Sequence, residues 1–182
     1  MKPSDITIIK RDVEGLLIPY GDKINLVPGT EVLVTQALGS SFTLNVNGNL
    51  VRIEGKDADA IGRKPIDMPV DRYEIKEDDT LNEEVLWEQM RTCYDPEIPV
   101  NVVDLGLIYE LSFKKLEKGY HVFVHMTLTA PGCGMGPVLS QEIEQRLLAV
   151  PNVKKADVIL IFDPPWNADM MSEVAKLELG VL

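Results

Sequence analysis

Residues 120–137 read Tyr-His-Val-Phe-Val-His-Met-Thr-Leu-Thr-Ala-Pro-Gly-Cys-Gly-Met-Gly-Pro, and this stretch decides the fold of the carboxy-terminal half. Apolar and polar side chains alternate from Tyr120 to Thr129, the period-two pattern of a half-buried strand. The glycine-rich loop that follows ends at Pro137, a residue suited to the first turn of a helix. The stretch therefore predicts a strand, a tight loop and a helix in succession.

Further elements are predicted on both sides of this stretch. Thr80 and Glu83 have the spacing of a capping box, which predicts a helix from there to about residue 93, before Pro96. Strands are predicted at 103–113 and 153–162, and a last helix at 170–179. Within the helix after the loop, the spacing predicts Leu139, Ile143 and Leu147 on the inward face and Gln141, Glu142, Glu144 and Gln145 outside. The order helix, strand, strand, helix, strand predicts an α+β domain, a small three-stranded sheet covered by helices.

The first seventy residues predict a different kind of structure. Phe42, Leu44 and Val46 alternate with polar neighbours, and Asn47-Gly48 follows, the dipeptide most suited to a tight hairpin turn. We therefore expect a small mostly-β domain over residues 1–73. An acid-rich linker is expected over 74–80, and the α+β domain over 81–182.

Composition excludes several classes of function. The 182 residues carry 18 basic and 29 acidic side chains, a net charge of −11, which repels a phosphate backbone and predicts that nucleic acid is not a partner. The apolar run 158–162 is far shorter than the roughly 20 residues of a membrane span, so no membrane partner is expected. Residues 1–5 lack the apolar core of a secretory signal. Two cysteines in such a chain predict the reducing cytoplasmic compartment.

Cys133 is the strongest candidate for chemistry. Its neighbours Gly132 and Gly134 leave backbone amides exposed at the start of a predicted helix, where amides and the helix dipole favour a thiolate over a thiol. The alternative is that the glycines only build a turn and Cys133 fills space. Cys93 lies on the apolar stripe of the first helix with Leu86 and Met90, which favours a buried core thiol over a partner of Cys133.

Other candidate residues carry a structural interpretation beside the functional one. Asp95 and Glu97 lie on a proline-bracketed loop, where they could act as acid and base or simply end a helix in solvent. Asp104 could accept backbone hydrogen bonds or face the same cavity as Cys133. Trp166, on a rigid Pro-Pro-Trp turn, could cover the edge of the core or form a docking surface.

The two histidines do not predict a shared metal site. His121 and His125 lie on one strand face but about 13 Å apart, which is too far to hold one ion. Either histidine could serve as a base for Cys133, because catalytic partners need only be close in space.

Three ordered motifs resemble a known family. They are Asp95-Pro96-Glu97-Ile98-Pro99-Val100-Asn101, Asp104-Leu105-Gly106-Leu107-Ile108-Tyr109 and Met126-Thr127-Leu128-Thr129-Ala130-Pro131-Gly132-Cys133. Together with Asp163-Pro164-Pro165-Trp166, they resemble the small iron–sulfur assembly domains, a family that includes PaaD and the cytosolic iron–sulfur targeting adaptors. The resemblance covers about residues 80–182, and the amino-terminal β segment is similar to the long, SufT-type form.

The resemblance implies a non-enzymatic, cytoplasmic carrier or adaptor in iron–sulfur cluster assembly or delivery. It carries over two positions only: Cys133, as a thiolate ligand of a transient iron–sulfur cluster, and the Asp95–Glu97 loop. The further candidates for the pocket or the motifs are Asp104, Thr129, Gly132, Gly134 and Trp166. The implied partners are iron–sulfur assembly proteins, client apoproteins and a second copy of the chain, with no nucleotide. A thiol-dependent enzyme with Cys133 as nucleophile, or an interaction module without metal, remains the alternative.

Overall fold

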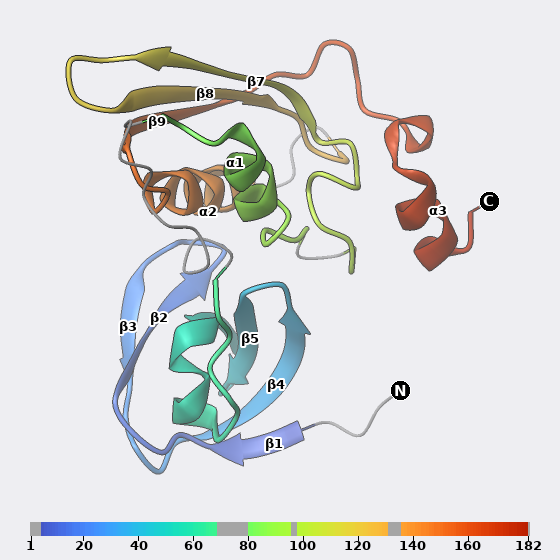
Figure 1. Ribbon diagram of the computed structural model, residues 1–182. Coiled ribbons are helices and arrows are strands. Elements are labelled where there is room, and N and C mark those ends of the chain that lie inside the picture. Colours follow the sequence, from blue (N-terminus) through green and yellow to red (C-terminus); the bar gives the residue numbers. More distant parts are fainter. Residues whose placement is uncertain (1–4, 69–79, 96–97, 131–135, 182) are drawn as a thin grey trace. The chain divides into compact units, whose positions relative to one another are not determined.

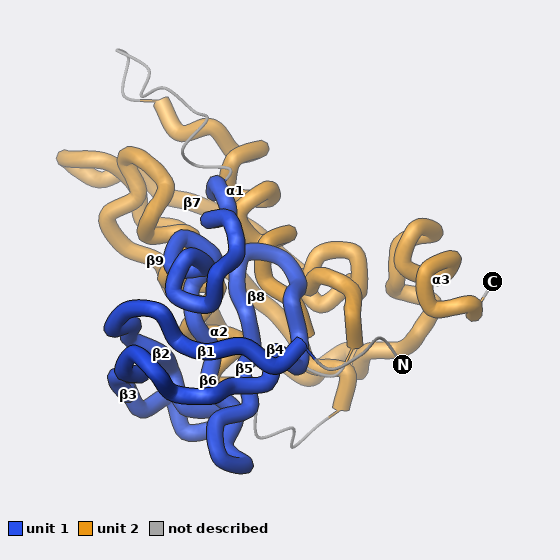
Figure 2. Tube along the Cα trace, turned by 90° about the horizontal axis from the view of Figure 1, so that it is seen from below, with its two compact units in different colours: residues 1–68 blue, residues 69–182 orange. Residues whose placement is uncertain are grey.

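The chain divides into two units, residues 1–68 (unit 1) and residues 69–182 (unit 2), each described here by itself (Figures 1 and 2). The computed structural model describes residues 5–68, 80–95, 98–130 and 136–181. The expected acidic linker at 74–80 lies outside the described residues except for Thr80.

Unit 1 is a six-stranded antiparallel sheet in the spatial order β1-β4-β5-β6-β2-β3. A 3₁₀ helix, η1, follows the last strand. The bounds are β1 Asp5–Ile8, β2 Val13–Ile18, β3 Lys23–Leu26, β4 Glu31–Leu38, β5 Ser41–Val46, β6 Asn49–Glu54 and η1 Gly55–Ile61.

The hairpin predicted around Asn47-Gly48 is confirmed. β5 and β6 pair from Val46 opposite Asn49 outward, and both turn residues have positive φ, 51° and 89°. Phe42, Leu44 and Val46 are buried as the alternation predicts, because alternate side chains of a strand point to one face. The mostly-β character expected of this part of the chain is therefore correct.

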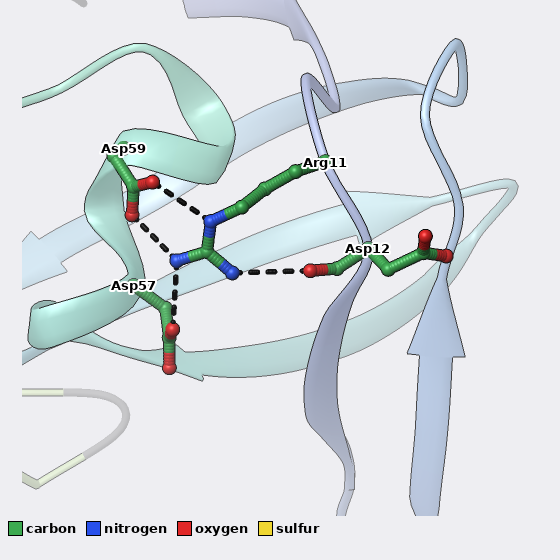
Figure 3. A network of polar contacts seen from close by, with 4 residues as sticks. All are labelled: Arg11, Asp12, Asp57 and Asp59. Carbon is green, nitrogen blue, oxygen red and sulfur yellow. Dashed lines mark hydrogen bonds and ion pairs between the residues drawn. The ribbon is translucent and has the colours of Figure 1, made fainter.

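A polar network fastens η1 to the loop between β1 and β2 (Figure 3). The Arg11 guanidinium contacts both carboxylates, Asp57 at 2.8 Å and Asp59 at 2.6 Å, and donates to the Asp12 backbone carbonyl. The hydrogen bond with Arg11 lowers the pKa of Asp59, and the two carboxylates raise the pKa of Arg11. These contacts link residues almost fifty positions apart in the chain.

Unit 2 is the predicted α+β domain. Its three-stranded sheet has the order β7-β8-β9, with β7 antiparallel and β9 parallel to β8. Helices α1 and α2 lie on one face of this sheet, and Figure 1 shows no element of unit 2 on the other face. The bounds are α1 Glu83–Met90, β7 Ile108–Lys115, β8 Tyr120–Met126, α2 Gly136–Leu148, β9 Val153–Leu160, η3 Ala168–Met170 and α3 Glu173–Leu179.

The core of unit 2 lies between the sheet and these helices. Tyr120, Val122, Val124 and Met126 of β8 are all buried, and burying an aliphatic side chain of this size contributes about 1.5–3 kcal/mol. The inward face of α2 is correctly predicted at Leu139, Ile143 and Leu147. The prediction for Glu142 is wrong: it is only 4% exposed, and it pairs with Arg146 one turn later at 3.7 Å. The pairing makes burial of that carboxylate tolerable.

Four predicted boundaries differ from the structure. The side chain of Asn82, not Thr80, caps α1 by accepting from the Glu84 amide, and the helix ends at Met90. Asn is among the best N-cap residues, above Thr, which explains the later start. The strand expected from residue 103 begins at 108, because residues 102–106 form turns. The last helix begins at Glu173, where the Ser172 hydroxyl caps it.

Among the described residues, the structure has no helix long and apolar enough to cross a membrane.

Candidate functional site

Three loops of unit 2 meet at one end of its sheet, called here the site end. β8 and β9 are parallel and both finish at this end, whereas the antiparallel β7 begins there. The loops are therefore 101–107 before β7, 127–130 after β8 and 161–172 after β9. Carboxyl ends of neighbouring parallel strands are a common place for a binding site, because loops converge there on a rigid support.

The strongest sequence candidate follows β8 at this end. Cys133, Gly132 and Gly134 lie outside the described residues, in the segment 131–135 that joins the loop after β8 to α2. On the two sides of that segment, Leu128 and Gly136 are neighbours: a Cβ added to Gly136 would lie 2.7 Å from the Leu128 Cδ1. Gly136 is therefore the residue that lets α2 begin against the end of β8. Thr129 is half-buried beside them.

Asn101 holds Asp104 in place. The Asn101 Oδ1 accepts hydrogen bonds from the backbone amides of Val103 (3.1 Å) and Asp104 (2.9 Å), and its Nδ2 donates to the Asp104 carboxylate at 2.6 Å. A side chain that binds the backbone two and three residues ahead stabilises a turn in place of a strand. Asp104 is thus oriented by a neighbour, and the spacing Asn-x-x-Asp was the sequence signal for it.

Asp95 has a structural contact. It is 6% exposed, and its Oδ1 accepts the backbone amide of Ile98 at 3.1 Å, which closes the turn after α1. An isolated bridge pairs Tyr94 with Asn101 and brings this turn to the loop that carries Asp104. Glu97, the second carboxylate of the predicted pair, lies outside the described residues.

Trp166 covers the edge of the core. Its ring is partly buried against the core of unit 2, and its Nε1–H donates to the Leu105 carbonyl at 2.8 Å. A tryptophan whose indole N–H binds a buried backbone carbonyl is held in one orientation. Trp166 therefore fastens the loop after β9 onto the loop before β7.

The same two loops also meet at residues of the quoted motifs that were not among the candidate site residues. Gly106 has a φ of 71°, and any Cβ there would collide with the backbone carbonyl of Met170. The Tyr109 hydroxyl donates to the Pro164 carbonyl at 2.8 Å and lies 3.5 Å from the Met170 sulfur. The signal for this contact was Gly106 itself, a glycine between two leucines where the strand was expected to continue.

At the site end, the pKa of Tyr94 is raised. Burial raises the pKa of the Tyr94 phenol, and the negative charges of Glu178 and Asp104 raise it further. Glu178 belongs to α3, and this helix begins beside the loops of the site end, because the amide of its cap residue Ser172 donates to the Asp104 backbone carbonyl at 2.8 Å. Directly after β8, the Thr127 hydroxyl is buried and has no hydrogen-bond partner within the described part of the chain.

The remaining candidates lie elsewhere. Cys93 is fully buried in the core of unit 2, as predicted. His121 and His125 lie on the face of β8 opposite the core and contact carboxylates, Asp157 at 2.8 Å and Glu110 at 2.9 Å. Over the described ranges, no three histidine, cysteine or acidic side chains are grouped so that they could hold a metal ion.

Comparison with known proteins assigns unit 2 to a family. The family model described as iron–sulfur cluster assembly protein matches residues 83–158. An Fe-S protein maturation auxiliary factor from Porphyromonas gingivalis is 48% identical over 100 residues, which cover 55% of this chain and 92% of that protein. The chain belongs to the iron–sulfur cluster assembly protein family. The resemblance drawn from the motifs is therefore confirmed.

Two further relatives show how much of the chain the family accounts for. The Fe-S protein maturation auxiliary factor SufT of Staphylococcus aureus is 39% identical over 87 residues, 48% of this chain and 96% of that protein. A crystal structure of a domain of unknown function, DUF59, from Bacillus anthracis has a TM-score of 0.50 and 32% identity, covering 55% of this chain and 92% of that one. Each relative is thus matched almost entirely by about half of this chain.

The matched residues can be placed on the fold. The family match runs from the first residue of α1 into β9, so this assembly domain holds α1, β7, β8 and α2 complete. Asp95, Asp104, Thr129 and Cys133 lie inside it. Trp166, α3 and the whole of unit 1 lie outside it.

Proposed function

We propose that this chain is an accessory factor, a carrier or adaptor, in the assembly or delivery of iron–sulfur clusters to client proteins. The observation that carries the proposal is family membership at 48% identity to a relative named as an Fe-S protein maturation auxiliary factor. The match includes Cys133 and two of the three loops of the site end, 101–107 and 127–130. The partners proposed are iron–sulfur assembly proteins and client apoproteins in the cytoplasm.

Cys133 is the proposed ligand of the iron–sulfur cluster. The cluster is a cargo that the chain binds and passes on, not a resident cofactor. Cys93 is buried in the core, so of the two cysteines Cys133 is the one offered as thiolate. Iron–sulfur clusters are held by about four thiolates or their equivalents. One thiolate per chain leaves the remaining positions to a second copy, a client or a small thiol, and such shared ligation favours transfer over permanent retention.

The described loops of the site end support a role in transfer. Asp104 is held by Asn101, and Trp166 and Tyr109 fasten the neighbouring loops, so the site end is a rigid support next to the segment 131–135. A ligand held on rigid elements keeps its geometry through repeated binding and release. Asp95 contributes by closing the turn after α1.

The alternative is an enzyme with Cys133 as nucleophile and His121 or His125 as base. Both imidazoles contact carboxylates on the outer face of the sheet. His121 is five residues before the end of β8, about 16 Å along the strand from the site end. These placements favour the carrier function over the enzyme. The third possibility is an interaction module that uses no thiol.

Replacing Cys133 tests the proposal. In cells that lack the native chain, Cys133→Ser is expected to reduce the activity of iron–sulfur client enzymes to the level of the deletion. The matched control is Cys93→Ala, which removes the other thiol and is expected to lower stability while retaining client activity in proportion to the folded protein. Client activity unaffected by Cys133→Ser would contradict both the carrier and the enzyme.

Anaerobic reconstitution of the purified full chain then separates the carrier from the enzyme. With iron and sulfide, the wild type is expected to gain visible charge-transfer absorption and bound iron, and Cys133→Ser is expected to gain neither. A chain that binds no iron yet turns over a thiol substrate without a client would instead establish the enzyme.

A further inference from the structure

The end of the unit 2 sheet opposite the site end is rich in lysine, although the unit as a whole is acidic. Residues 69–182 contain 20 acidic and ten basic side chains, whereas residues 1–68 contain nine and eight. Five of those ten bases lie within the β7–β8 hairpin or at the start of β9. They are Lys114, Lys115, Lys118, Lys154 and Lys155.

These lysines are exposed, and the two acids on the same face of the sheet, Glu110 and Asp157, contact the histidines and not the lysines. No carboxylate lies within ion-pair distance of any of the five ammonium groups in the parts of the chain that the structure describes. In the same unit the basic Arg146 is paired with Glu142, and both histidines contact acids. Like charges left close together raise the energy of the free surface and favour an anionic partner.

The strand register gathers two of the lysines around His121. Lys114 on β7 is opposite His121 on β8, and His121 is opposite Lys155 on β9. Residues directly opposite one another on neighbouring strands point to the same face, with Cα atoms about 5 Å apart. The row Lys114–His121–Lys155 therefore crosses the whole sheet on the face that bears no helix (Figure 1).

Apolar groups adjoin this row. Phe123 follows two residues after His121 on the same face, and the two rings lie 4.0 Å apart between centroids. Ile159 is exposed beyond it on β9. We name the surface formed by Lys114, His121, Phe123, Lys155 and Ile159 the lysine face. It offers two lysines at the hairpin end and an aromatic ring beside them, and the carboxylate of Asp157, opposite Phe123 and in contact with His121, borders it.

We propose that the lysine face binds an acidic peptide segment of a partner protein, with carboxylates on Lys114 and Lys155 and an apolar side chain on Phe123. The chemistry favours a peptide over nucleic acid, because the face contains no arginine and the unit around it carries a net charge of −10, which repels a long phosphate backbone. A short acidic segment can place its carboxylates on the lysines at the hairpin end and only its apolar side chain beside Phe123 and Asp157.

The test measures binding of a defined probe to the full chain. The probe is a short fluorescein-labelled peptide with one phenylalanine between two runs of glutamate. Its binding to the full chain is measured by fluorescence anisotropy. Lys114→Gln with Lys155→Gln is expected to weaken binding about tenfold, since each exposed ion pair changes an affinity by up to about fivefold. Added salt is expected to weaken the wild type more than this variant.

The matched control removes the same charge elsewhere. Lys56 and Lys64 are exposed lysines of unit 1, and Lys56→Gln with Lys64→Gln is expected to bind the probe within about twofold of the wild type. Phe123→Ser, with folding checked by tryptophan fluorescence, is expected to weaken binding while leaving the charge unchanged. An equal loss in the Lys56 and Lys64 variant, or no binding by the wild type, overturns the proposal.

Two further measurements separate this inference from its rivals. A single-stranded oligonucleotide of the same charge as the peptide is expected to bind more weakly, and tighter binding of the oligonucleotide overturns the choice of a peptide. Cys133→Ser is expected to bind the peptide as the wild type does. The lysine face and the proposed thiolate ligand can therefore fail independently of each other.

Discussion

Replacing Asn101 with alanine is expected to release the loop that positions Asp104. The substitution removes three hydrogen bonds at once, two from the backbone amides of Val103 and Asp104 to Oδ1 and one from Nδ2 to the Asp104 carboxylate. It leaves the backbone able to keep the same conformation, so the effect measures the side chain itself. The perturbation therefore tests whether one amide organises the site end.

The expected cost follows from the geometry. A neutral hydrogen bond contributes about 0.5–1.5 kcal/mol and one to a charged group about 1.5–3 kcal/mol. The three bonds would sum to about 2.5–6 kcal/mol if they were fully buried. Because Asn101 and Asp104 are only half-buried, water replaces part of each bond, and we expect a loss of about 2 kcal/mol. For a unit of this size, that corresponds to a fall in Tm of about 8 °C.

Tryptophan fluorescence during urea unfolding reports on the correct unit. Both tryptophans, Trp87 and Trp166, lie in unit 2, so their fluorescence reports on the unfolding of that unit. Asn167→Ala is the matched control: Asn167 also accepts a backbone amide, that of Asp169 at 2.9 Å, but it is exposed and makes this one bond in the described structure. We expect that control to lose less than about 1 kcal/mol.

A change below about 0.5 kcal/mol for Asn101→Ala, or one equal to that of Asn167→Ala, would refute the role assigned to Asn101. Asn101→Asp refines the test, because it keeps the Oδ1-type acceptor but brings two carboxylates together where the 2.6 Å bond stood. We expect that variant to be less stable than the wild type at neutral pH and to recover in acid, as protonation of one carboxylate restores a donor.

Two predictions concern pH. The hydrogen bond with Arg11 lowers the pKa of Asp59 below its usual 3.8, so the contribution of Asp59 to the stability of unit 1 should be full above pH 3.8 and be lost as pH falls through the lowered pKa. An NMR titration of the Asp59 carboxyl checks this pKa, and an unchanged midpoint in Arg11→Gln would contradict the assigned cause. Burial, Glu178 and Asp104 raise the pKa of Tyr94 above its usual 10.0, so unit 2 should lose stability as pH rises above 10. Ultraviolet titration should show one phenol that ionises late and that Tyr94→Phe removes. A Tyr94 midpoint at 10 or below would refute the raised pKa.

Much of the candidate site could be read from residue patterns, but the partners of its residues could not. The motifs marked Asp95, Asp104 and Trp166 as candidates, and all three lie at the loops of the site end. Their contacts to the Ile98 amide, the Asn101 side chain and the Leu105 carbonyl depend on how the turns close. The contact of Trp166 with Leu105 joins positions 61 residues apart, and no local pattern specifies such a pair.

The sequence alone determined the elements of this protein and their order, because periodicity and turn chemistry act over a few residues. The alternation in β8, the Asn47-Gly48 hairpin and the inward stripe of α2 are local in this sense. Tertiary structure decided the rest. The Asn101 side chain accepts hydrogen bonds from the backbone amides of Val103 and Asp104, which are then not available for a strand, so β7 starts at Ile108. Glu142 is buried and pairs with Arg146. The register of three strands placed Lys114 and Lys155 on either side of His121, because neighbours across a sheet are set by strand pairing and not by distance along the chain.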